Sequence, residues 1–159
     1  MKRAVCPGSF DPITYGHLDI IGRASAQFDE VVVAVGNNRA KEGYFTVEER
    51  MAMIAETTAK FGNVKVDSWK GLLGEYCKAN NIDVIIKGLR AMSDFDYELQ
   101  MAQVNLQGSG VESMFMATSP AHSFLSSSLI KELAHYDGDV SGMVPPVVNA
   151  ALKAREAGK

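Results

Sequence analysis

Cysteine, long hydrophobic runs and excess positive charge are scarce or missing in this sequence. Cys6 and Cys77 are too few and too far apart for a disulfide framework or a zinc site. No apolar run approaches membrane-spanning length, and residues 1–8 lack the apolar core of a signal peptide. We therefore expect a cytoplasmic protein with reduced thiols and no membrane partner.

The charge balance argues against a nucleic-acid partner. The chain has 16 Lys and Arg residues and 19 Asp and Glu residues, which gives a net charge of −3 at pH 7. This composition shows no electrostatic footprint for a nucleic-acid backbone. Single basic residues inside a cleft are still able to bind a small polyanion.

Several catalytic motifs are missing as well. The sequence has no Gly-x-x-x-x-Gly-Lys-Ser/Thr loop and no Gly-x-Gly-x-x-Gly segment after its first predicted strand. This argues against a P-loop NTPase and against a conventional dinucleotide fold. A nucleophile elbow and a cluster of protein metal ligands are also lacking, so we expect neither a covalent nucleophile nor a protein-bound metal.

Apolar strand-like runs alternate with amphipathic segments along the chain. The 159 residues suit one domain, residues 1–159. The β-branched run Glu30–Gly36 is typical of a parallel strand covered on both faces. We predict a Rossmann-like α/β fold, a doubly wound five-stranded parallel sheet with helices on both faces. Strands are predicted at 4–6, 30–36, 64–68, 83–87 and 112–117, and helices at 18–28, 47–60, 72–80 and from about 94, 126 and 145.

Local signals add detail to three helices. Thr46 and Glu49 have the spacing of a capping box. Ser93 or Asp94 is suited to cap the next long helix. The charged end of the last helix, residues 153–159, is expected to fray. The long helix after residue 94 should bury a stripe formed by Phe95, Leu99, Ala102 and Leu106.

The stretch from Pro7 to His17 is the most informative part of the sequence. It lies between a predicted strand and a predicted helix, and Thr14 is suited to cap that helix. Gly16 and His17 would lie in the first turn, where free amides and the helix dipole favour an anion. A histidine there can donate a hydrogen bond to a phosphate oxygen whose charge grows during reaction. The same pattern also fits a plain turn with an exposed histidine.

Residue types that bind phosphate follow several predicted strands. Ligands of such sheets bind outside the carboxyl ends of the strands, near a switch in strand order. Hydroxyls, ammonium groups and a guanidinium gathered there suit phosphate groups. Without a nucleophile, such a site favours direct transfer between two phosphorylated substrates, because a phosphate monoester needs no base to attack. The residues concerned are Ser9, His17, Lys41, Lys87, Gly88, Arg90, Ser126, Ser127 and Ser128.

Several strings of this sequence resemble one family in particular. Thr14-Tyr15-Gly16-His17 resembles the T/H-x-G-H signature of the nucleotidyltransferase superfamily, whose second mark is a serine-rich helix start such as Ser126–Glu132. Bacterial phosphopantetheine adenylyltransferases are similar over essentially the whole chain. The matching strings, in this order, are Pro7–Thr14, Lys87–Ala91 and Asp94–Ala102.

The resemblance implies a reaction and its partners. The family transfers AMP from ATP to 4′-phosphopantetheine, giving dephospho-coenzyme A and pyrophosphate with the help of Mg²⁺. The metal is expected to bind through substrate phosphates. The resemblance also implies a homohexamer built as a dimer of trimers, with coenzyme A as a possible feedback inhibitor.

The resemblance assigns roles to individual residues. His17, Lys41 and Arg90 are the expected catalytic residues, and His17 is expected to stabilise the transition state at the α-phosphate. Ser9 and Phe10 are expected to contact both substrates. The other expected contacts are Lys41, Lys87 and Leu73 with phosphopantetheine, and Gly88, Leu89, Arg90, Glu98, His122, Ser123, Phe124, Leu125, Ser126, Ser127 and Ser128 with ATP.

Two positions depart from the family pattern, and two other functions stay open. Lys87 stands where many relatives carry arginine, and His122 stands where tryptophan or tyrosine is common. The adenine contacts at His122 are therefore in doubt. The alternatives are a nicotinate-nucleotide adenylyltransferase or cytidylyltransferase of the same superfamily, and a non-catalytic nucleotide-binding sensor on the same fold.

Overall fold

A five-stranded sheet forms the centre of the computed structural model, which describes residues 1–37 and 43–159. All neighbouring strands are parallel, in the order β3-β2-β1-β4-β5. This confirms the predicted doubly wound sheet. The strands are β1 (Arg3–Gly8), β2 (Glu30–Gly36), β3 (Val64–Trp69), β4 (Val84–Leu89) and β5 (Glu112–Ala117).

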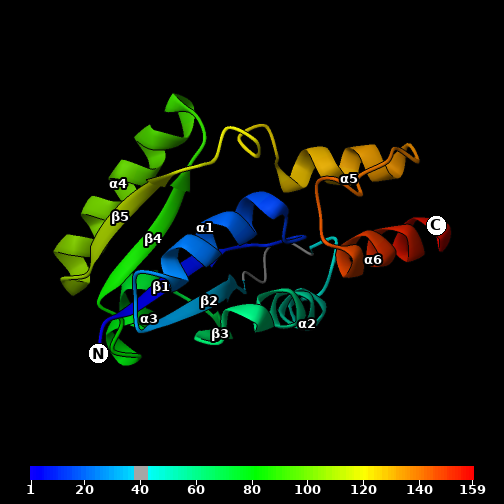
Figure 1. The fold of residues 1–159 in the computed structure, drawn as a ribbon. Coiled ribbons are helices and arrows are strands. Elements are labelled where there is room, and N and C mark those ends of the chain that lie inside the picture. The colour runs from blue at the N-terminus through cyan, green and yellow to red at the C-terminus, as the bar shows by residue number, and fades with distance from the viewer. Residues whose placement is uncertain (38–42) are drawn as a thin grey trace.

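Helices cover both faces of this sheet (Figure 1). One face carries α1 (Tyr15–Ser25), α2 (Val47–Thr58) and the short 3₁₀ helix Ala59–Phe61, and the other carries α3 (Leu73–Ala79) and α4 (Met92–Ser109). Beyond the carboxyl ends of β1 and β2, α5 (Ser127–His135) and α6 (Pro146–Ala157) lie side by side. No helix in the described part of the chain is long and apolar enough to cross a membrane.

Alternate residues of the central strands enter two separate cores. Ala4 and Cys6 of β1 pack toward α1, whereas Val5 packs toward α3. Because side chains alternate along a strand, both halves of the run must be apolar when both faces are covered. This explains the unbroken β-branched run of β2, whose Val31 and Val32 enter different cores.

The neighbouring strands β1 and β4 separate toward their carboxyl ends. β1 pairs with β2 along all six of its residues, from Arg3 to Gly8. With β4 it pairs only at Ala4–Val84 and Val5–Ile85. The strand order reverses between β1 and β4, which is where a sheet of this kind opens a crevice for a ligand.

Two predictions about α4 are wrong. Its N-cap is Ala91, not Ser93 or Asp94. Of the expected buried stripe, Leu99 and Leu106 are exposed, whereas Asn105 is buried. The helix turns small and polar residues inward because it packs closely on α3, where a Cβ on Gly74 would lie 2.5 Å from Ser109 Oγ and 3.4 Å from Asn105 Oδ1.

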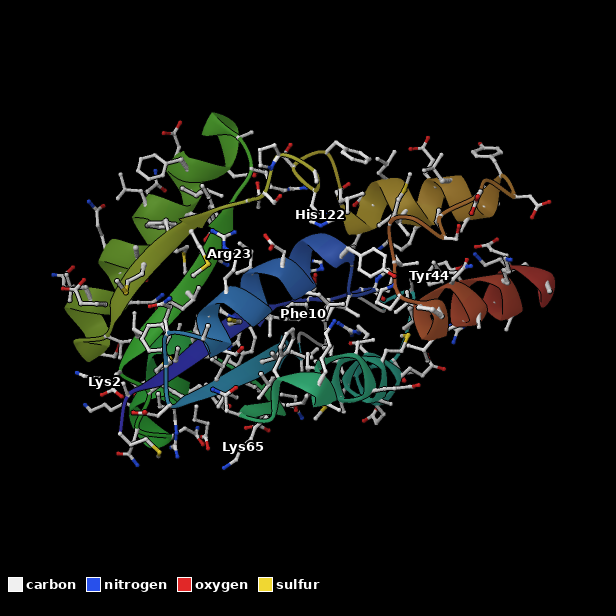
Figure 2. The ribbon with its side chains drawn as sticks, in the orientation of Figure 1. Lys2, Phe10, Arg23, Tyr44, Lys65 and His122 are labelled. Carbon is white, nitrogen blue, oxygen red and sulfur yellow. The ribbon has the colours of Figure 1, made fainter. Side chains whose placement is uncertain are left out.

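The expectation that the chain frays from residue 153 is also wrong. α6 continues to Ala157, and Arg155 Nη2 donates to both carboxylate oxygens of Glu49 at 2.8 and 2.9 Å. Arg155 Nη1 donates to the carbonyl of Tyr44 at 2.6 Å, and the Tyr44 hydroxyl donates to Glu156. Tyr44 lies beside α6 in Figure 2. These contacts fasten the last helix to α2 and to the segment before it.

Replacing Arg155 tests this attachment. We expect Arg155→Gln to lower the free energy of unfolding by about 1 kcal/mol, because the ion pair with Glu49 is half exposed and screened by water. Urea unfolding measures the change. Lys153→Gln, at an exposed position of the same helix, should change it by less than about 0.5 kcal/mol, and equal losses in both variants would contradict the attachment.

Candidate active site

A cavity of about 440 Å³ lies where β1 and β4 separate. Its walls come from the loop after β1, the start of α1, the end of β4 and the start of α5. The cavity brings together most of the residues expected at an ATP site. These are Ser9, Phe10, His17, Gly88, Arg90, Glu98, His122, Leu125, Ser126, Ser127 and Ser128, with Lys87 from the expected acceptor site.

The remaining predicted residues lie elsewhere. Leu89, Ser123 and Phe124 do not line this cavity, and Phe124 is exposed. Leu73 lines a neighbouring cavity of about 320 Å³ between α3 and α4. Lys41 lies outside the described residues. The two cavities share four lining residues, which makes them adjoining compartments: Pro7, Gly8, Lys87 and Glu98.

The ring of His17 is held by the cap of its own helix. The Thr14 N–H donates to His17 Nδ1 at 3.0 Å, and Thr14 Oγ1 accepts from the His17 N–H at 3.2 Å. In a neutral imidazole one ring nitrogen accepts and the other carries the proton. Because Nδ1 accepts, the proton is on Nε2. The predicted N-cap is confirmed, and it also sets the tautomer.

The surroundings of His17 keep its ring neutral. Burial lowers the pKa of His17 from 6.5 to about 4, and the positive charge of Arg90 adds to the effect. The ring of Phe10 packs edge-on against His17, with 5.0 Å between ring centroids. At neutral pH the side chain is therefore a hydrogen-bond donor without a charge, which suits it to bind an oxyanion without protonating it.

The start of α5 offers more backbone donors than the start of α1. Among the first-turn amides of α1, Tyr15 donates to the Met143 carbonyl at 3.0 Å and His17 donates to Thr14, so only Gly16 lacks a partner among the described residues. In α5, Ser126 Oγ accepts from the Leu129 N–H at 3.1 Å. The amides of Ser127 and Ser128 are thereby left at the cavity wall, where the helix dipole favours an anion.

Ser127 also connects two walls of the cavity. Its hydroxyl donates to the carbonyl of Pro12 at 2.8 Å, so α5 is tied to the loop after β1. His122 lies on the segment between β5 and α5 (Figure 2). Its carbonyl approaches Gly16, where an added Cβ would lie 3.6 Å from the oxygen. The start of α1 and the backbone of His122 are therefore in van der Waals range of each other.

Each cation of the site has an acidic partner on α4. Lys87 Nζ lies 3.3 Å from Glu98 Oε2, and Arg90 Nε lies 3.5 Å from Asp94 Oδ2. Arg90 Nη1 also donates to the Leu125 carbonyl at 2.9 Å, which fixes its guanidinium against the segment before α5. Asp94 lies in the first turn of α4, and Arg90 lies just before that helix, which places the two side chains within reach of each other.

Sequence reasoning missed two buried charged residues behind the cavity, Asp11 and Arg50. Asp11 lies within the Pro7–His17 stretch, followed directly by Pro12, and this local sequence does not reveal a buried carboxylate. Arg50 is a clearer case, because it falls on the inward face of α2 together with Met53 and Ile54. A charged residue on the core side of an amphipathic helix signals a specific buried partner.

Charge stabilisation is the chemistry that this arrangement supports. Cys6 lines the cavity, but burial raises the pKa of its thiol to about 12, so it is not a thiolate nucleophile at neutral pH. Within residues 1–37 and 43–159, no group of three His, Cys, Asp or Glu side chains is placed to hold a metal ion. What the site offers is a neutral donor, two cations and a helix N-terminus around one space.

Comparisons with known proteins agree with this geometry. A family model described as cytidylyltransferase-like matches residues 5–133. A phosphopantetheine adenylyltransferase of Streptomyces coelicolor is 61% identical over 155 residues, 98% of each chain. Proteins of the same name from Corynebacterium diphtheriae and Frankia casuarinae are each 58% identical, over 96% and 99% of each chain respectively.

The environment of His17 predicts how stability depends on pH. The unfolded chain takes up a proton at this residue near pH 6.5, whereas the folded chain does so only near pH 4. The contribution of His17 to stability is therefore complete above pH 6.5 and is lost as the pH falls toward 4. Urea unfolding at several pH values should show this loss, and His17→Gln should lack it.

NMR of the His17 imidazole checks its neutral state and its tautomer independently. We expect the nitrogen NMR signals of His17 to show a neutral ring protonated at Nε2 at all pH values from 5.5 to 8. A titration of this ring near pH 6.5, or a proton on Nδ1, would contradict the structure.

Proposed function

The chain belongs to the cytidylyltransferase-like family, and from this premise we propose that it is a pantetheine-phosphate adenylyltransferase of coenzyme A biosynthesis. It transfers AMP reversibly from ATP to 4′-phosphopantetheine, giving dephospho-coenzyme A and pyrophosphate. One observation carries the proposal: the Nε2–H of His17, the guanidinium of Arg90 and the serine-rich start of α5 face one cavity. Relatives named phosphopantetheine adenylyltransferase, matching nearly the whole chain, support this choice of acceptor.

The transfer step is an in-line displacement at the α-phosphorus. An oxygen of the acceptor phosphate forms the new bond to phosphorus as the bond to the bridging oxygen breaks, and the electron pair leaves with pyrophosphate. No proton needs to move, which fits a site without a general base. His17 donates from Nε2 to a non-bridging oxygen, and Arg90 neutralises the charge that accumulates there.

The start of α5 binds the leaving group. The amides of Ser127 and Ser128 and the Ser128 hydroxyl hold the β- and γ-phosphates, where backbone donors and the helix dipole act together. Ser126 keeps that turn in shape through its bond to the Leu129 amide. Gly88, Glu98, His122 and Leu125 make the other ATP contacts in this proposal.

The acceptor occupies the adjoining cavity and reaches into the first. Its phosphate binds Ser9 and Lys87, with Lys41 as a third contact, and its arm passes Leu73 between α3 and α4. Since Lys87 and Glu98 line both cavities, the acceptor phosphate meets ATP at their junction. When the acceptor binds, Lys87 leaves Glu98 and pairs with the acceptor phosphate.

Magnesium is the metal of this proposal, carried by the phosphates of ATP. The described residues offer no cluster of three metal ligands, and this donor set fits an ion that arrives with the nucleotide. When bound, Mg²⁺ neutralises the phosphates of the leaving group. His17, Arg90 and α5 position those phosphates.

Assembly into a homohexamer is part of the same proposal, as is feedback inhibition by coenzyme A. Exposed apolar side chains on α4 and on the edge strand β5 support association. Tyr97 is 64% exposed, and Val104 and Met114 are each 56% exposed. An unpaired strand edge beside such side chains is a surface that soluble chains usually cover.

A pyrophosphate assay tests the function. With ATP, Mg²⁺ and 4′-phosphopantetheine we expect pyrophosphate release that depends on the acceptor. Nicotinate mononucleotide as acceptor and CTP as donor serve as comparisons, and activity with either would favour another superfamily reaction. Tight ATP binding without turnover of any acceptor would indicate a nucleotide sensor.

His17→Ala separates catalysis from binding. We expect kcat to fall by about 10²–10³, the scale for losing one transition-state donor. The Kd for ATP, measured by calorimetry, should change by less than about threefold. His135→Ala serves as control, since His135 lies on the far end of α5, paired with Glu156. An equal loss of ATP affinity would mean that His17 only positions the nucleotide.

A further inference from the structure

The loop that carries Ser9 and Phe10 has a strained backbone, and side chains behind the cavity hold it in place. Phe10 has φ of 47° although it is not glycine, and its ring is buried against His17. Such a backbone is unfavourable for a residue other than glycine and persists only where the surrounding structure enforces it. The groups that enforce it act on the geometry of the site.

Arg50 of α2 is the first of these groups. Its Nη1 donates to the carbonyl of Ser9 at 2.8 Å, immediately before the strained residue. Its Nε donates to the carbonyl of Phe45 at 3.1 Å. A guanidinium binds two backbone carbonyls through donors fixed in one rigid plane, whereas the three donors of an ammonium group rotate freely.

Asp11 is the second group, and it binds the same neighbouring segment from the other side. Its two oxygens accept from the Tyr44 and Phe45 amides, each at 2.8 Å. Lys131 of α5 lies 3.6 Å from the same carboxylate. Asp11 therefore links the loop after β1 both to residues 44–45 and to the helix that begins with the serines.

The two charged side chains pack closely around the backbone at Gly43. A Cβ added to Gly43 would lie 2.8 Å from the Phe45 carbonyl oxygen and 3.1 Å from both Arg50 Nη2 and Asp11 Oδ2. Asp11 and Arg50 are each only 7% exposed. Buried charges of this kind act through defined hydrogen bonds more than through net stability.

We propose that Asp11 and Arg50 are positioning residues of the transfer reaction, which hold Ser9 and Phe10 in the conformation that aligns the acceptor phosphate with His17. This inference rests on the proposed function. Neither side chain needs to touch a substrate. Their effect passes through the backbone of the Ser9–Phe10 loop, where a misplacement of about 1 Å can cost about 10²-fold in rate.

Arg50→Met tests the proposal against a matched control. We expect kcat/KM for 4′-phosphopantetheine to fall by about 10–100-fold, with the Kd for ATP changed by less than about threefold. Thr58→Val is the control on the same helix, because it also removes a buried hydrogen bond, from its hydroxyl to the Ile54 carbonyl at 2.7 Å. It should lower the melting temperature but leave kcat/KM unchanged.

Two milder variants keep the proposal testable if Arg50→Met does not fold. Arg50→Lys should recover part of the lost kcat/KM, since an ammonium can reach one of the two carbonyls. Asp11→Asn should lose activity, because the side-chain NH₂ group of Asn would face the backbone N–H of either Tyr44 or Phe45. That N–H would then have no acceptor. If every variant loses only as much activity as Thr58→Val does, the positioning role is wrong.

Hydrogen exchange tests the positioning role independently of the proposed reaction. Within residues 7–13, the amides of Gly8, Ser9, Phe10, Asp11 and Ile13 should exchange faster in Arg50→Met than in the unaltered protein, and at the unaltered rate in Thr58→Val. If the unaltered protein releases no pyrophosphate with 4′-phosphopantetheine, the proposed function fails, and this exchange pattern still decides whether Arg50 holds the loop. Unchanged exchange at residues 7–13 would overturn the inference.

Discussion

The separation of β1 from β4 is the constraint on which the rest of the structure depends. Two parallel strands that paired along their whole length would bring Gly8 against Gly88 and close the space between them. Instead the pairing ends at Val5 and Ile85, and the released ends carry the loop of Ser9 and the cations Lys87 and Arg90. The backbone of β1 keeps its hydrogen bonds to β2, so the opening costs few backbone hydrogen bonds.

Electrostatics within that opening are balanced before a substrate arrives. Lys87 and Arg90 have carboxylates of α4 beside them, while His17 is kept neutral by burial and by the charge of Arg90. A site built for polyanions thereby avoids a cluster of like charges. Asp94 and Glu98 lie four residues apart, which is why one helix can supply both partners.

Much of this fold could be predicted because its signals are local. The strands at 30–36 and 112–117 match the structure to the residue, as does the Thr46–Glu49 capping box. The inward face of α4 could not be predicted, because Leu99 and Leu106 follow the helical period yet tertiary packing turns Asn105 inward. At the site, His17 and the serines at 126–128 carry a recognisable motif. The roles of Asp11 and Arg50 depend on contacts about 30 to 40 residues apart in the chain, which no local pattern records.

The bond from the Tyr15 amide to the Met143 carbonyl has a consequence for synthesis on the ribosome. The Tyr15 amide belongs to the first turn of α1, yet its acceptor is made much later, on the segment between α5 and α6. A nascent chain that has already produced α1 still lacks this hydrogen-bond acceptor for the first turn of the helix. The site can therefore be complete only after the segment between α5 and α6 has left the exit tunnel.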